Sequence, residues 1–158
     1  MIDQPMSDKS FALATSRQAL MRICAEATVE ELRRALDECG GIPDAEDVRP
    51  PEAGLVMLRG RIGGDGARFN VGEATVTRAV VRLAGGTVGY SYLMGRSAER
   101  ARLAAIVDAL GQDDAWRAKL DDALVAPVRA RREAELTLQR EQAAATRVNF
   151  FTLVRGED

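Results

Sequence analysis

The sequence has 158 residues, a length typical of one domain, and contains 20 arginines, 2 lysines, 24 acidic residues and no histidine. Without histidine, this chain alone cannot form a Ser-His-Asp or Cys-His nucleophile, nor a histidine-ligated zinc or haem site. The net charge of −2 and the hydrophobic share of 46% are typical of a soluble globular domain and do not indicate a nucleic-acid partner.

The composition also gives no sign of a metal site or a membrane segment. Cys24 and Cys39 occur without a CxxC motif, which indicates two buried free thiols in a reducing compartment. No stretch has the charge and length pattern of a signal peptide or a membrane span. We therefore expect a cytoplasmic protein with no metal and no membrane partner. A single domain should cover residues 1–158, with residues 1–12 disordered.

The N-terminal part of the chain predicts a pair of amphipathic helices. Apolar residues recur at helical spacing over residues 15–27. Thr28, followed three residues later by Glu31, has the pattern of a capping box, and the helix that it opens should end at Gly40.

The middle of the chain predicts strands. These strands are residues 55–62, 74–83 and 87–94, the last two joined through Gly85-Gly86 as a hairpin. In the first strand, Val56, Leu58 and Ile62 share one face, whereas Arg59 and Arg61 project from the other. The preceding segment, 42–50, is a further candidate that its prolines disfavour.

Helical periodicity returns after residue 96. Ser97 is positioned to cap a helix, and a second helix containing Trp116 should stop before Pro127. Residues 128–146 favour a helix with few apolar residues, which makes it a candidate for contact with another subunit. The segment 148–154 is typical of a strand or an extended arm. The predicted fold is α+β: a small, mostly antiparallel sheet flanked by N-terminal and C-terminal helices.

Positive charge gathers in the middle of the chain. Residues 55–96 contain six arginines and two acidic residues, a balance of +4, whereas the rest of the chain is acidic. Residues 59–70 combine three arginines with a glycine-rich loop, and such loops can form amide nests for anions. From the pattern alone an ordinary connecting loop is favoured, with a phosphate or substrate loop and a subunit contact left open. The excess of arginine over lysine reflects either nucleotide bias in the coding DNA, the favoured explanation, or phosphate binding.

Other candidate residues also have a purely structural interpretation. Tyr90 and Tyr92 could stack on a base, but their alternate spacing favours a packed sheet face. Thr75, Thr77 and Arg78 could line a pocket beside the loop, although ordinary strand surface is favoured. The acidic pairs at 113–114 and 121–122 favour solvated surface over a metal site. The pair Phe150-Phe151 belongs either to a strand docked on the sheet or to a partner-binding arm.

Several segments, taken in order, carry a resemblance to a known family. They are Glu52–Val56, Arg61–Gly66, Phe69–Arg78, Val81–Leu83, Gly89–Ser91, Gly95-Arg96 and Arg147–Gly156. In combination they resemble the G-subunit family, PhnG, of the bacterial carbon–phosphorus lyase system. The resemblance extends over nearly the whole chain from about residue 15.

The resemblance implies a non-redox, non-metal role within a multi-subunit enzyme. Family members assemble with H, I and J subunits into a core complex with paired copies of each. The G, H and I subunits, with an ABC-type ATPase-like subunit, are associated with displacement of the adenine of ATP by a phosphonate such as methylphosphonate. The product is α-D-ribose 1-methylphosphonate 5-triphosphate, so ATP is a substrate of the complex and no cofactor is expected on this chain alone. Later carbon–phosphorus bond cleavage is attributed to the iron–sulfur J subunit.

The resemblance transfers no catalytic residue onto this chain, and the I subunit is the expected carrier of catalysis. The favoured hypothesis is an accessory subunit that buries its surface against the I subunit; the interface candidates are Leu136, Phe150, Phe151 and Arg155. A second hypothesis adds substrate or phosphate binding by Arg59, Arg61, Gly63, Gly64, Gly66, Arg68, Thr75, Thr77 and Arg78. A purely structural scaffold without substrate contact is the alternative. A stand-alone enzyme or a nucleic-acid binder is a distant third.

Overall fold

The computed structural model describes residues 8–63 and 66–146, with side chains from residue 16 onward. The N-terminal helices are α1 (Asp8–Glu26) and α2 (Val29–Cys39), followed by strands β1 (Ala45–Arg61), β2 (Arg68–Leu83) and β3 (Val88–Met94). The C-terminal half contains α3 (Ala98–Leu110), α4 (Asp114–Leu120), a π-helical turn (Asp121–Val125) and α5 (Ala126–Ala145). The predicted α+β fold is confirmed.

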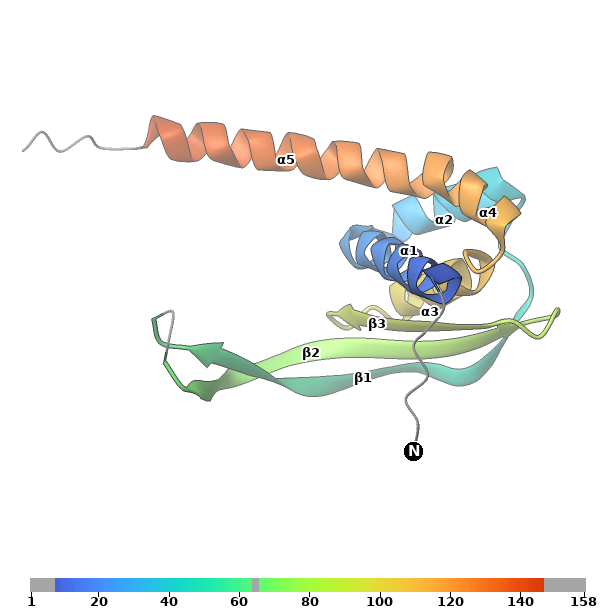
Figure 1. Ribbon diagram of the computed structural model, residues 1–158, viewed down its shortest axis with the longest axis horizontal. Coiled ribbons are helices and arrows are strands. Elements are labelled where there is room, and N and C mark those ends of the chain that lie inside the picture. The colour runs from blue at the N-terminus through green and yellow to red at the C-terminus, as the bar shows by residue number, and fades with distance from the viewer. Residues whose placement is uncertain (1–7, 64–65, 147–158) are drawn as a thin grey trace, which may run out of the picture.

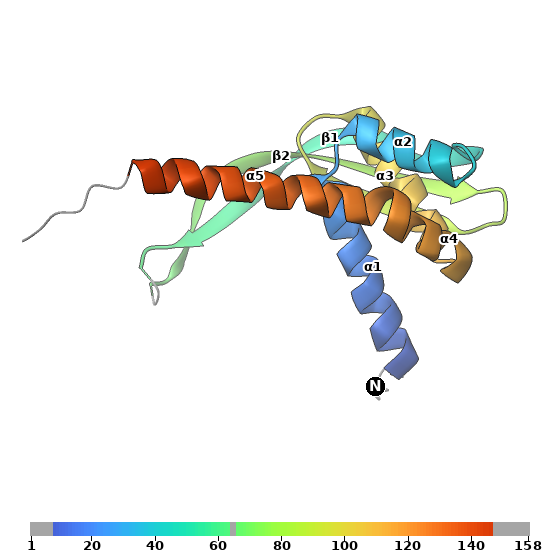
Figure 2. The same ribbon diagram turned by 90° about the horizontal axis from the view of Figure 1, so that it is seen from above.

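The three strands form one antiparallel sheet in the order β1-β2-β3, so β1 and β3 are edge strands (Figure 1). All the helices lie on one side of this sheet, with α3 directly on β2 and β3 and with α2 and α5 farther out (Figures 1 and 2). We call the opposite side of the sheet the open face, because no described element covers it.

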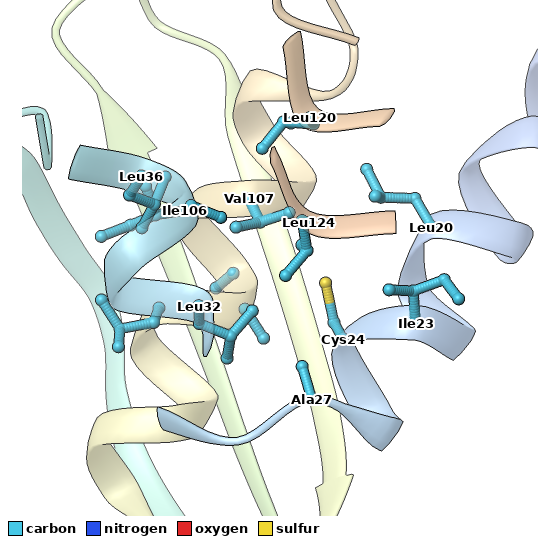
Figure 3. Packing of buried hydrophobic residues seen from close by; sticks show 14 of the residues in the cluster. Leu20, Ile23, Cys24, Ala27, Leu32, Leu36, Ile106, Val107, Leu120 and Leu124 are labelled. Atoms are coloured by element: carbon cyan, nitrogen blue, oxygen red, sulfur yellow. The ribbon is translucent and has the colours of Figure 1, made fainter. Parts of the chain in front are cut away.

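The hydrophobic core lies between the sheet and the helices. Helix α3 is its centre, since every residue from Leu103 to Leu110 is buried, and this all-round burial is typical of a helix packed on several sides. Figure 3 shows leucines of α2 and of the α4 region meeting α3, with α1 closing the other side. The sheet contributes Ala79, Val81 and Leu93 from the face that α3 covers.

Local sequence signals set the helix ends as predicted. Thr28 accepts a hydrogen bond from the Glu31 amide while its own amide donates to the Glu31 carboxylate, which completes the capping box. Ser97 caps α3 by accepting from the Arg100 amide. Gly85-Gly86 joins β2 to β3, and Gly86 has φ of +86°, a value that favours glycine.

Several predicted boundaries differ from those in the structure, and β2 begins at Arg68, six residues before the predicted start. Helix α1 begins at Asp8, inside the range expected to be disordered, and residues 1–7 lie outside the described residues. The candidate strand at 42–50 and the predicted strand at 55–62 form one continuous strand, β1. Its prolines, Pro50 and Pro51, lie where the register with β2 shifts, and an edge strand tolerates their missing N–H groups.

The helix predicted to stop before Pro127 does not stop there. Between α4 and α5 the backbone widens into a π-helical turn, in which the Ala126 amide donates to the Asp121 carbonyl five residues back. The chain therefore re-enters α5 with Pro127 in the first turn, where a proline needs no helical N–H partner. The predicted stop before Pro127 is therefore wrong, because the π-helical turn lets the helical backbone continue through the proline.

Helix α5 is anchored at one end and leaves the body at the other (Figures 1 and 2). Val128 is its one buried residue, so apolar packing holds only its first turn. Arg131 adds polar contacts: its guanidinium bonds the Glu31 carboxylate at 2.7 Å, the Glu26 carbonyl at 2.7 Å and the Glu135 carboxylate at 2.7 Å. Burial alone would raise the pKa of the Glu31 carboxyl, but the hydrogen bonds that it accepts from Arg131 and from the Thr28 amide, together with nearby arginine charge, lower it. Beyond Glu135 the helix is exposed.

A buried carboxylate ties α1, α3 and β3 together. Asp108 of α3 is 1% exposed and accepts two hydrogen bonds from the Arg17 guanidinium, at 2.7 and 2.6 Å. It also accepts the backbone N–H of Tyr90, on the free edge of β3, at 2.8 Å. The hydrogen bond to Asp108 raises the pKa of Arg17, and three donors offset the cost of burying the carboxylate.

Candidate functional site

Beyond the body of the protein, β1 and β2 continue as a two-stranded ribbon, which we call the hairpin arm (residues 55–63 and 66–73; Figure 1). Strand β3 pairs with β2 only from Val76 to Arg82, so the arm has no third strand. A β-bulge near Leu58 makes Val71 the extra residue of β2. The Val71 side chain packs close to Gly60: a Cβ added at Gly60 would lie only 2.6 Å from it.

The arm gathers three arginines on one face at its tip. Arg61 lies directly opposite Arg68 in the antiparallel register, and Arg59, opposite Asn70, shares their face because side chains alternate along a strand. All three are exposed, and none forms an ion pair with another described residue. Like charges directly opposite are unfavourable, so this cluster is suited to an anion that is not part of the described chain.

The glycines of the tip have a structural role. Gly63 has φ of +62°, and a Cβ at Gly66 would lie 2.3 Å from the Ile62 carbonyl oxygen. Both positions therefore need glycine to turn the chain between the strands. Gly64 lies outside the described residues.

The other predicted phosphate-binding residues lie away from this cluster. Thr77 is 1% exposed beneath α3, and its hydroxyl donates to the Gly95 carbonyl at 2.7 Å. Thr75 is half-buried, and Arg78 projects from the open face, where it pairs with Glu52 at 3.3 Å. The structure therefore divides the predicted set and keeps Arg59, Arg61 and Arg68 together at the tip of the arm.

The open face carries aromatic side chains that were expected to be packed. Tyr90 and Tyr92 are 54% and 56% exposed, because the residues of β3 that α3 covers are Gly89, Ser91 and Leu93. Alternation correctly predicts that Tyr90 and Tyr92 share one face of β3, but the expectation that this face is packed is wrong. A hollow of about 470 Å³ adjoins the tyrosines; its other lining residues include Met21 of α1 and Arg49, Arg78 and Val80 of the sheet. The small residues at 89 and 91 were the signal that a helix covers the other face.

One of the predicted interface residues, Leu136, lies within the described part of the chain. Leu136 of α5 is exposed, and so is Leu138, which sequence reasoning did not select. Phe150, Phe151 and Arg155 lie outside the described residues. Leu136 and Leu138 are unpartnered apolar residues on a helix that extends from the body.

The described residues hold no group of three or more side chains suited to a metal ion. Of the acidic pairs, Asp113 accepts backbone N–H groups at the start of α4, and the other three residues are exposed. Cys24 and Cys39 are buried free thiols, and burial raises the pKa of Cys24 to about 12. None of the described helices is long and apolar enough to cross a bilayer.

Exposed apolar side chains on the arm, the open face and α5 are typical of a subunit of a larger assembly. The family model for "Phosphonate metabolism protein PhnG" matches residues 15–156, and the chain belongs to this family. A relative from Rhizobium meliloti (strain 1021) is 51% identical over 158 residues, which is the full length of both chains. That protein is named alpha-D-ribose 1-methylphosphonate 5-triphosphate synthase subunit PhnG.

Proposed function

We propose that this chain is a subunit of α-D-ribose 1-methylphosphonate 5-triphosphate synthase in phosphonate metabolism, without activity of its own. The observation that carries the proposal is the full-length identity of 51% to a subunit of that name. The exposed apolar surfaces of the arm, the open face and α5 support it, because a subunit needs such surfaces to bind its partners. The partner that we expect to be in direct contact is the I subunit, within a complex that also contains H and J subunits and two copies of this chain.

The reaction that we assign to the complex forms a bond between a phosphonate oxygen and C1′ of ATP. The glycosidic bond to adenine breaks, and the base leaves with the bonding electron pair and takes up a proton. The triphosphate must be held while this exchange takes place. This chain has no histidine to serve as the usual proton carrier, so we assign it assembly and substrate positioning.

The first test is assembly. Expressed alone, the chain should self-associate or have low solubility, because its apolar surfaces remain in water. Co-expression with the I subunit should yield a soluble complex, measured by affinity co-purification and size-exclusion chromatography. A chain that stays monomeric alone and does not co-purify with the I subunit would contradict the proposal.

A second role, contact with substrate, is favoured by the cluster at the tip of the arm. Arginine binds phosphoryl oxygens through a planar fork of N–H donors, and Arg61 and Arg68 present two such forks side by side. We propose that Arg59, Arg61 and Arg68 hold the triphosphate of ATP in the assembled synthase. Thr77 is excluded from this role because its hydroxyl is buried and already bonded.

Replacing Arg61 with alanine should lower the turnover of the reconstituted complex about ten- to a hundredfold. This corresponds to about 1.5–3 kcal/mol for one hydrogen bond to a charged group. The measurement is adenine release from ATP in the presence of methylphosphonate. Arg82→Ala is the matched control, since Arg82 pairs with Glu46 near the other end of the strands. Equal turnover of the Arg61 variant and the wild type, with assembly intact, would remove Arg61 from the site.

A further inference from the structure

The hairpin arm exposes apolar side chains on both of its faces. Leu55 and Met57, on the face that continues the helix-covered side of the sheet, are 62% and 52% exposed. Leu58 and Phe69, on the face that continues the open face, are 44% and 43% exposed. The register supports this division. Thr77, which lies beneath α3, pairs with Ala53, and Leu55 and Met57 follow Ala53 by two and four residues, so all three share the helix-covered face.

This two-sided pattern differs from that of an ordinary surface hairpin. A hairpin that lies on a partner's surface buries one face and keeps polar residues on the other. A two-stranded ribbon is also only marginally stable in water by itself. The apolar residues of the arm are therefore best accounted for by contacts on both sides, as in a strand pair enclosed by a groove.

The tip has a different chemistry from the rest of the arm. Arg59, Arg61 and Arg68 follow the apolar section on the same face as Leu55 and Met57, without an ion-pair partner among the described residues. A groove that encloses the arm would thus need apolar walls along its length and negative charge at its inner end. The phosphoryl oxygens of a bound nucleoside triphosphate would supply that charge.

We propose that the hairpin arm inserts into a groove of the I subunit, the partner named above. Both faces of the arm are then buried, and its arginines reach the triphosphate at the end of that groove. This inference rests on the proposed function and specifies how the chain reaches the substrate. Helix α5 extends from the same end of the body as the arm (Figures 1 and 2). A partner that encloses the arm is therefore also positioned to contact Leu136 and Leu138.

Neighbouring residues of β1 provide the test, since Met57 and Leu58 point to opposite faces. Met57→Asp and Leu58→Asp should each weaken binding of the partner subunit at least tenfold, measured by titration of the purified partner. Ile42→Asp is the matched control, because Ile42 is an exposed apolar residue before the other end of β1. All three variants should keep the wild-type circular dichroism spectrum and melting temperature, since none of the three side chains belongs to the buried core. Weakened binding from only one of the two arm variants would show docking by one face and overturn the inference.

Thiol labelling gives a second measurement, which does not require the introduction of a charged residue into the arm. Met57→Cys and Leu58→Cys each introduce one exposed thiol, while the native Cys24 and Cys39 are buried. The rate of maleimide labelling at each position should fall at least tenfold when the partner subunit is bound. Labelling that slows at only one position, or at neither, contradicts insertion. If the wild-type chain fails to bind the partner at all, the proposed function itself is wrong.

The arginines are tested separately in the same complex. Arg61→Ala should leave the affinity for the partner unchanged without nucleotide and reduce the affinity of the complex for ATP. If the Arg61 variant binds the partner subunit more weakly in the absence of nucleotide, then carboxylates of the partner face the tip of the arm. The proposal that the arginines bind the triphosphate would then be wrong.

Discussion

Replacing Gly89 with alanine is expected to destabilise the fold by about 3 kcal/mol or more. A Cβ at this position would lie 2.0 Å from the Ala105 carbonyl oxygen and 2.6 Å from the Ala109 amide nitrogen. Both atoms belong to the backbone of α3, so no side-chain rotation relieves the clash. Helix α3 would have to move off β3, and α3 is the centre of the core. Urea denaturation followed by circular dichroism measures the loss.

Gly85→Ala is the control for this prediction. Gly85 lies in the turn between β2 and β3, and an added Cβ there would meet no atom within 4 Å. Its φ is not positive, so the backbone also tolerates alanine. We expect a change within about 0.5 kcal/mol. If Gly89→Ala proves as mild as Gly85→Ala, then β3 and α3 do not approach each other as closely as the structure has them.

Replacing Arg17 with methionine is expected to cost about 3 kcal/mol. Removing one partner of a buried ion pair typically costs about 3–5 kcal/mol, because the other charge stays buried without compensation. Asp108 is 1% exposed, whereas the Arg17 side chain is 40% exposed, so we expect the lower end of that range. The Arg17 guanidinium also lies 5.7 Å from the centre of the Tyr90 ring, a cation–π contact that methionine would lose. The free energy of unfolding in urea measures the effect.

Arg22→Met provides the comparison on the same helix. Arg22 is 82% exposed and lies 3.4 Å from Glu26, a surface pair that contributes little. Its replacement should change stability by less than about 0.5 kcal/mol. Similar losses from both substitutions would show that Asp108 does not depend on Arg17 for its charge balance.

The sequence predicts those parts of the candidate site that lie on a single strand. Alternation along a single strand placed Arg59 and Arg61 on one face, and the structure agrees. The position of Arg68 opposite Arg61 could not be obtained in this way, because a bulge near Leu58 shifts the register of β2. The sequence also groups Thr77 and Arg78 with the loop, but α3 packs on one face of β2, so the Thr77 side chain is buried and Arg78 projects from the open face.

The sequence by itself determined the local structure of this protein. The capping box at Thr28, the cap at Ser97 and the turn at Gly85-Gly86 depend on hydrogen bonds and torsion angles within a few residues, which neighbouring side chains control. The tertiary structure alone decided which apolar residues are covered. Alternation predicts two faces of a strand but does not say which one meets a helix. Tyr90 and Tyr92 are exposed because α3 packs on the opposite face of β3, which carries the small residues Gly89 and Ser91. The same holds for the hairpin arm, whose apolar residues lie beyond the part of the sheet on which α3 packs.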